Sequence, residues 1–211
     1  MGAEGALGGK KGATGAETSA AGAGASGPGA VAASDAPAPL AATGAAGAPH
    51  RAMRRANREV TDVGELRAIV GRATVVRVAS HDAEGLFVVP LNFGLDWDDA
   101  AALPTLWLHS AAQGRKADAW LADPEVALEL DQPVGVIEGD FSCAYSLAYE
   151  SVMAQARVTR VDDPAQKLHG LTRLMEHMAP GAPVRFSEAA VERVCVWRVD
   201  VERLTGKRRE S

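Results

Sequence analysis

The segment that decides the fold lies near the middle of the chain and runs Leu106-Trp107-Leu108-His109-Ser110-Ala111-Ala112-Gln113-Gly114-Arg115-Lys116. Its first residues are apolar and strand-forming, the next are small or polar, and a helical pattern begins at Arg115. A glycine and a basic pair at a helix start favour a bound anion, because backbone N–H groups and the positive helix end face the same point. Arg115 would add a bidentate fork and Lys116 a point charge. The segment indicates a phosphate site, although such a basic pair is often only solvated.

Upstream of this segment, two runs of strand-forming residues, 74–79 and 86–95, flank a polar linker that ends at Gly85, which predicts a hairpin. Pro90 lies inside the second run and cannot donate to a ladder, so we expect it at an edge, a bulge or a strand mouth. A short helix should precede the hairpin, with Thr61 as its N-cap and an end near Gly71.

Downstream, apolar and polar residues alternate over 126–130, 151–161 and 194–201, which predicts three further strands beside the strand at 105–109. Residues 115–121 predict a short helix. The mixed composition of 131–148 predicts a loop. Together these elements predict a mainly β fold, a small antiparallel barrel with a few short helices.

One longer helix is predicted after the strand at 151–161. Asp163-Pro164-Ala165-Gln166 forms a capping box with proline in the first turn, and Pro180-Gly181 stops the helix. Its expected apolar face consists of Leu168, Leu171, Leu174, Met175 and Met178.

Composition divides the chain near residue 50. The segment 1–50 is nearly all Ala and Gly and holds no Ile, Phe, Trp or Tyr. Such a segment cannot offset its ordering entropy, so we expect a disordered tail over 1–50 and one folded domain over 51–211.

Charge and cysteine usage narrow the function classes. The formal net charge of −5 gives no general attraction to nucleic acid, and no apolar run is long enough to span a membrane. Cys143 and Cys195 are far apart and outside any CxxC pattern, which favours a cytoplasmic protein without a disulfide framework or zinc site. His81, His169 and His177 match no metal-binding spacing and are interpreted as structural. Trp107 and Trp197 are expected in the core.

The order of several short motifs resembles the pyridoxamine 5′-phosphate oxidase-like flavin proteins, and within them the nitroimidazole-resistance branch. The motifs are Pro90-Leu91-Asn92-Phe93, His109-Ser110-Ala111 with Gly114 and Lys116, Asp123-Pro124-Glu125-Val126, Tyr149-Glu150-Ser151-Val152, the helix Asp163 to His177 and Leu204-Thr205-Gly206-Lys207. The resemblance spans Arg54 to Lys207. The chain departs from the pattern at Ala156, where relatives commonly have Gly, and at Glu150, where a basic residue is frequent.

The resemblance implies a split β-barrel, small, antiparallel and Greek-key-like, that forms a homodimer with FMN at the subunit interface. It implies that Arg115 and Lys116 bind the phosphate, with close contacts from Ser110 and Gly114. The segment Pro90, Leu91 and Asn92 would line the flavin ring system. His109 would lie near the reactive face as a cofactor contact and the catalytic candidate, because an imidazole can donate or position a proton. On the residues alone, His109 could instead cap backbone groups.

Three functions stay open at this point. The leading one is an FMN-dependent oxidoreductase that reduces small oxidised compounds, nitroaromatics among them, and in which the cofactor performs the chemistry. The second uses the deazaflavin F420 in place of FMN. The third is a non-catalytic flavin- or haem-binding protein. The absence of a glycine-rich dinucleotide fingerprint indicates that any nicotinamide donor binds only transiently.

Overall fold

The computed structural model describes residues 52–210, and the expected disordered tail of residues 1–50 lies outside the described residues. The strands are β1 (Glu59–Val60), β2 (Val76–Asp82), β3 (Gly85–Leu91), β4 (Gly94–Asp96), β5 (Thr105–Ser110), β6 (Glu125–Ile137), β7 (Ser146–Val161) and β8 (Cys195–Arg209). The helices are α1 (Val63–Arg72), α2 (Arg115–Ala122), α3 (Pro164–Met178) and α4 (Glu188–Arg193), with 3-10 turns at Ala56–Arg58 and Ser142–Ala144. The predicted mainly β fold with a few short helices is confirmed.

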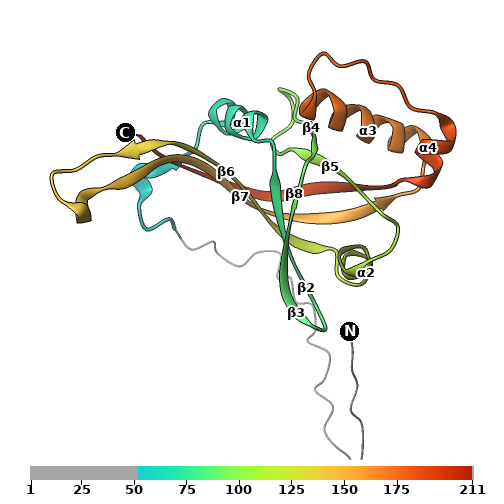
Figure 1. The fold of residues 1–211 in the computed structure, drawn as a ribbon, viewed down its shortest axis with the longest axis horizontal. Helices are drawn as coiled ribbons and strands as arrows, with labels where there is room; N and C mark the ends of the chain where they lie inside the picture. The colour runs from blue at the N-terminus through green and yellow to red at the C-terminus, as the bar shows by residue number, and fades with distance from the viewer. Residues whose placement is uncertain (1–51, 211) are drawn as a thin grey trace, which may run out of the picture. The chain divides into compact units, whose positions relative to one another are not determined.

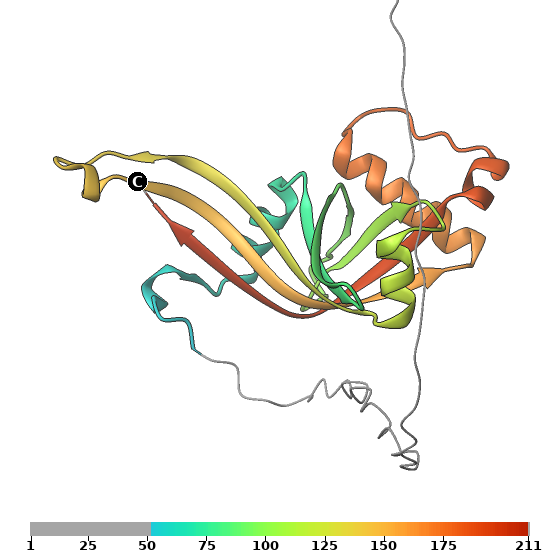
Figure 2. The same cartoon turned by 60° about the horizontal axis from the view of Figure 1, so that its bottom comes forward.

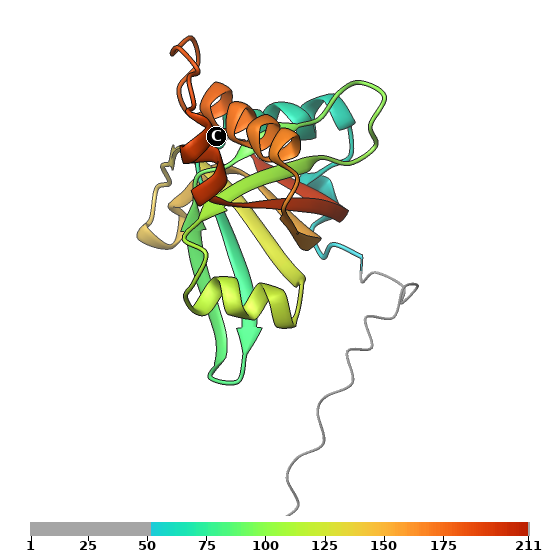
Figure 3. The ribbon, with the colours of Figure 1, turned by 90° about the vertical axis from the view of Figure 1, so that its right-hand side faces the viewer.

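All strand pairs are antiparallel, in the order β3-β2-β6-β7-β8-β5-β4, with β1 beside β8. Strands β6, β7 and β8 are long and strongly curved (Figure 2). Helix α2 lies beside the β2–β3 hairpin, whereas α3 covers β4 and β5 at the other end of the sheet (Figures 1 and 3). The barrel stays open, because β3 and β4 are its two edge strands. The edge position expected for Pro90 follows from its place in β3.

Two tryptophans fix α2 in the core. The rings of Trp120 on α2 and Trp197 on β8 meet edge to face, with centroids 5.2 Å apart. Each indole N–H has a partner at 2.9 Å, the hydroxyl of Ser80 for Trp120 and the hydroxyl of Ser110 for Trp197. Trp107 and Trp197 are both buried, as predicted. The start of α2 is therefore held rigidly against β2 and the end of β5.

Helix α3 approaches β5 closely at a glycine. A Cβ atom on Gly170 would lie only 2.5 Å from the ring of Trp107. The N-cap half of the predicted capping box is confirmed, since the Asp163 carboxylate accepts from the Gln166 N–H at 2.8 Å. The predicted apolar face is wrong at two positions, because the helix packs through the line Lys167, Gly170, Leu171 and Leu174, which leaves Leu168 and Met178 exposed.

Several predicted boundaries shift. The N-cap of α1 is Asp62, not Thr61, because the Asp62 carboxylate accepts from the Glu65 N–H at 2.8 Å. The β2–β3 turn holds only Ala83 and Glu84, so the strands extend into the expected linker. Strand β8 runs on to Arg209, and α4 and β4 were not predicted.

The predicted loop at 131–148 is confirmed only over residues 138–145, which include a 3-10 turn, and is wrong on either side of them. Strands β6 and β7 continue as a two-stranded arm, which we define as residues 131–149 and which projects from the barrel (Figure 2). Pro133 and Gly135 mark a shift of register in the arm, and this bulge interrupts the alternation by which strands are recognised in a sequence. No helix in residues 52–210 has the length and apolar character needed to cross a bilayer.

Candidate functional site

The turn between β5 and α2 has an open helix start. Gly114 is the N-cap of α2 and has φ +119°, a conformation that side chains of L-residues rarely adopt. No side chain caps the helix, and its first intrahelical bond runs from the Asp118 N–H to the Gly114 carbonyl at 3.1 Å. The N–H groups of residues 115–117 therefore point out of the helix end without helical partners. This arrangement favours an anion.

Arg115 is held by the β2–β3 hairpin. Its Nε and Nη2 donate to the two carboxylate oxygens of Asp82 at 2.7 and 2.9 Å, and its guanidinium lies 4.4 Å from the centroid of the Phe87 ring. Glu84 approaches to 3.6 Å. Hydrogen bonding from Arg115 lowers the pKa of Asp82, and the reciprocal bond raises the pKa of Arg115. A phosphate contact by the fork of Arg115 would require this pairing to open.

Lys116 differs from Arg115, because no hydrogen bond or ion pair involves its ammonium within residues 52–210. It lies on the first turn of α2, next to Ala117, which is completely buried. The helix is thus anchored by Ala117 and Trp120, while the neighbouring lysine stays available. Of the predicted phosphate ligands, Lys116 and the backbone at Gly114 are the groups left free to bind.

His109 and Ser110 end strand β5 with different roles. The side chain of His109 is exposed and points away from the core. The Ser110 hydroxyl accepts from Trp197 and donates to the Ala111 carbonyl at 2.6 Å, so its side chain is already engaged. A contact from Ser110 to a ligand would have to use its backbone or a remaining lone pair.

Pro90, Leu91 and Asn92 lie at the far end of the edge strand β3. Pro90 is exposed and opposite Arg77 of β2 in the ladder. The side-chain amide of Asn92 donates to the thioether of Met178 at the end of α3. Because Phe87 of the same strand touches Arg115, these residues lie roughly 10 Å or more along the strand from the α2 start. The structure brings Arg115 to β3, but it does not bring Pro90 to Asn92 into contact with the turn.

Glu150, one of the two departures from the family pattern, is an ion-pair centre. It accepts from Arg72 at 2.5 Å and from Arg208 at 2.9 Å. Burial raises the pKa of Glu150, but the hydrogen bonds and charges of the two arginines outweigh burial and lower it. The negative charge is thus matched within the chain.

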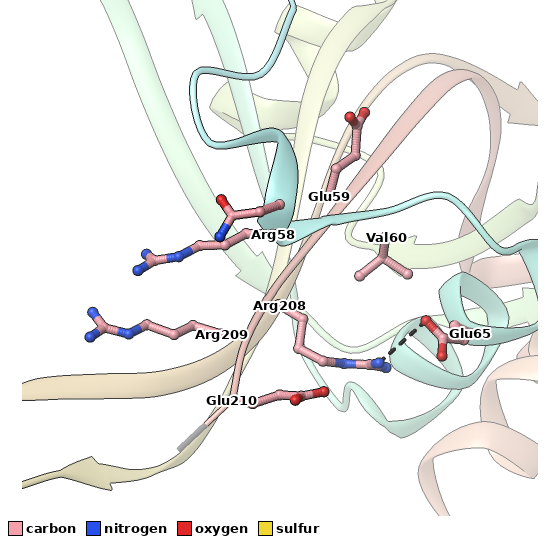
Figure 4. A pocket seen from close by; sticks show the side chains of 8 residues that line it. Arg58, Glu59, Val60, Glu65, Arg208, Arg209 and Glu210 are labelled. Carbon is pink, nitrogen blue, oxygen red and sulfur yellow. Dashed lines mark hydrogen bonds and ion pairs between the residues drawn. The ribbon is translucent and has the colours of Figure 1, made fainter.

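A hollow of about 400 Å³ lies between β1, α1 and the end of β8 (Figure 4). Arg208 points into it and meets Glu65 at 3.3 Å. Arg58 and Arg209 point together in the opposite direction. Acidic and basic groups are mixed around this hollow, which favours a structural role for its ion pairs over binding of a single anion.

Three residues that position the candidate site were not singled out from the sequence. Asp82 and Phe87 hold Arg115, and Ser80 holds Trp120. The available signal was the short spacing between the two hairpin strands, since a two-residue turn brings Asp82 and its neighbours to a tip. Nothing in the local sequence shows that this tip folds against α2.

The fold and the turn define a class: an open antiparallel β-barrel with an uncapped helix start after its fifth strand. Residues 62–208 match the family model described as pyridoxamine 5′-phosphate oxidase, and the chain belongs to this family. The resemblance inferred from the sequence is thereby confirmed. No curated protein matches the chain significantly.

Solved structures support this assignment. A candidate 5-nitroimidazole antibiotic resistance protein from Bacteroides thetaiotaomicron is 31% identical, with a TM-score of 0.61, and the match covers 71% of this chain and 85% of that one. The flavocytochrome Anf3 from Azotobacter vinelandii is 20% identical, with a TM-score of 0.62 over 76% of this chain and 73% of its own. An FAD- and haem-binding protein from Mycobacterium smegmatis is 16% identical, with a TM-score of 0.62 over 73% and 74%. The last two show the fold alone.

Proposed function

We propose that the chain is an FMN-dependent oxidoreductase that reduces small oxidised compounds, nitroaromatics among them. The observation that carries the cofactor assignment is the open start of α2, where Gly114, free backbone N–H groups and Lys116 meet. The name of the 31% identical relative supports nitroaromatics as the substrate class.

The residues at this turn fit a phosphate. A Cβ atom on Gly114 would meet nothing within 4 Å, so the backbone there is open to an approaching group. Backbone N–H groups at the helix start and the charge of Lys116 supply what a phosphate dianion requires. Arg115 joins them if it exchanges Asp82 for the phosphate, and Ser110 contributes from the strand end.

The ring system and the reaction are assigned to the edge strand and to His109. Exposed Pro90, with half-buried Leu91 and Asn92 beside it, offers an edge for a flat ring. Bound FMN supplies the electron and hydride transfer, and the protein binds and orients it. The exposed imidazole of His109 holds or donates a proton to the reduced substrate.

A homodimer completes the proposal. The candidate cofactor residues His109, Gly114 and Arg115 are exposed in the single chain, whereas cofactor sites bury most of their ligand. The arm adds an independent reason, because it carries exposed Val134, Val136, Phe141, Tyr145 and Leu147. An isolated two-stranded hairpin is marginal in water, so the arm needs a partner. We assign both roles to a second copy, with FMN at the interface.

Cysteine usage supports a cytoplasmic location. Cys143 is exposed and Cys195 is buried, and both are free thiols. Such thiols suit a reducing compartment.

The absorbance spectrum of the purified full chain tests the cofactor, because FMN, F420 and haem absorb differently. We expect a yellow protein that saturates with FMN at one per chain. Uptake of F420 or haem in place of FMN would replace the proposal with one of its alternatives.

Anaerobic reduction of a nitroimidazole by the FMN-loaded chain, with a reduced nicotinamide nucleotide as the electron donor, then tests the activity. The variant His109→Ala is expected to lose rate while it keeps FMN. Unchanged rates in this variant would remove His109 from the chemistry.

A further inference from the structure

A cavity of about 560 Å³ lies between α1, the loop after β4 and α3, apart from the turn before α2. Thr105 at the start of β5 lines it, whereas the proposed cofactor residues begin at the end of that strand. Ser110 lies five positions after Thr105 on this strand, which is a distance of roughly 17 Å along the strand. The cavity volume is in the range of small-molecule sites.

One wall of the cavity is apolar and rigid. It consists of Leu95, Trp97, Ala101 and Leu103. Trp97 is buried, and its indole N–H donates to the Ala101 carbonyl at 3.1 Å, which fixes the loop. Such a wall suits a flat apolar ring.

The opposite side presents hydrogen-bond donors around the Asp96 carboxylate, which already accepts hydrogen bonds from three side chains. Asp96 accepts from the Trp107 indole at 2.7 Å, from His169 at 2.6 Å and from Arg173 at 2.5 Å. Arg173 uses its Nη1 on Glu176. Within residues 52–210, Nη2 of Arg173 makes no hydrogen bond, so it remains for a ligand. His169 donates through Nε2, so the Nδ1 of its neutral ring is an acceptor and adds no donor.

Arg67 adds a second donor. Its Nη1 pairs with the exposed Asp99 at 2.5 Å and its Nη2 donates to the Asp98 carbonyl at 2.9 Å, but its Nε is buried without a partner. An unpaired buried donor is costly unless an acceptor reaches it. The guanidinium also lies 5.6 Å from the centroid of the Trp97 ring, beside the apolar wall.

The acidic groups of the cavity are already engaged. Asp96 has its three donors, and the Asp98 carboxylate accepts from the N–H groups of Ala100 and Ala101 at 2.9 and 2.8 Å. What remains is donors on one side and an apolar wall on the other. We propose that this cavity binds a small aromatic carboxylate, with its ring against Trp97 and its oxygens toward Arg67 and Arg173.

Gly71 offers a clean way to fill the cavity. It lines the cavity from α1, and a Cβ atom there would meet nothing within 4 Å. Because leucine has the higher helix propensity, Gly71→Leu blocks the cavity without harming the helix. Ala68→Leu, at an exposed position of the same helix that does not line the cavity, is the matched control.

Calorimetric titration of the full chain with benzoate tests the proposal, with benzyl alcohol as the neutral probe. We expect saturable benzoate binding at one per chain, at least about tenfold weaker in Gly71→Leu and in Arg67→Met and unchanged in Ala68→Leu. Benzyl alcohol should bind more weakly, and saturating FMN should leave the benzoate affinity unchanged.

Four results would overturn the proposal. They are the absence of saturation at millimolar benzoate, equal affinity in Gly71→Leu, equal affinity for benzyl alcohol, and competition by FMN, which would place benzoate at the cofactor site. Failure of FMN to bind at all would count against the proposed function but not against this cavity.

Discussion

Asp82 and Arg115 form an ion pair beside the start of α2. While Arg115 is paired with Asp82, only Lys116 of the two basic residues is free to face a phosphate there. We predict that Asp82→Asn raises the affinity for FMN, by up to about tenfold, because it releases the fork of Arg115. The pair is exposed to solvent and screened, so the free energy of unfolding should change little. Fluorescence titration of FMN and urea unfolding measure the two quantities. A loss of FMN affinity would mean that Asp82 positions Arg115 for binding.

Asp96 is one of the residues through which acid should destabilise the fold. Burial raises its pKa, but hydrogen bonds from His169, Trp107 and Arg173 outweigh burial and lower it below the ordinary value. A carboxylate with a lowered pKa stabilises the folded state fully above the unfolded pKa of about 3.9, and this contribution is lost as pH falls through the folded pKa.

The corresponding variant is Asp96→Asn. We predict that it lowers the free energy of unfolding at pH 7 by roughly 1–3 kcal/mol, and that this difference from the parent chain shrinks below about pH 4. Urea unfolding at both pH values measures it. A difference that is the same at pH 7 and at pH 3 would show that the ionised carboxylate is not the stabilising species.

At the scale of elements, the contact of α3 with β5 depends on the missing side chain at Gly170. We predict that Gly170→Ala destabilises the fold by about 1–3 kcal/mol, although alanine favours helices, because the new methyl group would overlap the Trp107 ring. Gly71→Ala, where a Cβ meets nothing, is the control and should be neutral or stabilising. Thermal unfolding of both variants gives the comparison, and equal melting temperatures would contradict the packing described here.

The elements that were predictable are those with a local signal. The N-cap at Asp163 and the alternation in β7 and β8 place the start of α3, the end of β7 and the start of β8 to within one residue. The arm was missed because Pro133 and Gly135 interrupt its pattern, and because exposed apolar residues there gain nothing from the chain's own core. The pairing of Arg115 with Asp82 joins residues far apart in sequence, and no local pattern predicts it.

At the scale of the molecule, the arm leaves backbone groups along both of its outer strand edges without partners among residues 52–210 of a single chain. Strand β8 accompanies β7 only as far as Tyr149, and β2 accompanies β6 only over Ala127 to Glu129, so the arm has two free edges. We predict that Val136→Ser with Phe141→Ser shifts the chain from dimer toward monomer, since both side chains are exposed in the single chain. Light scattering after size exclusion measures the mass, and Leu121→Ser, exposed on α2, is the control. A dimer unaffected by the arm variants would place the interface elsewhere.

The central claim is that the start of α2 binds the phosphate of FMN. Its most direct measurement is the dissociation constant of FMN for the full chain, for Lys116→Met and for Arg185→Met, which removes an exposed arginine from the loop after α3. We predict FMN binding that weakens at least about tenfold in Lys116→Met and stays unchanged in Arg185→Met. Riboflavin, which lacks the phosphate, should bind both variants and the parent chain equally. Equal FMN affinity in Lys116→Met and the parent chain would contradict the account.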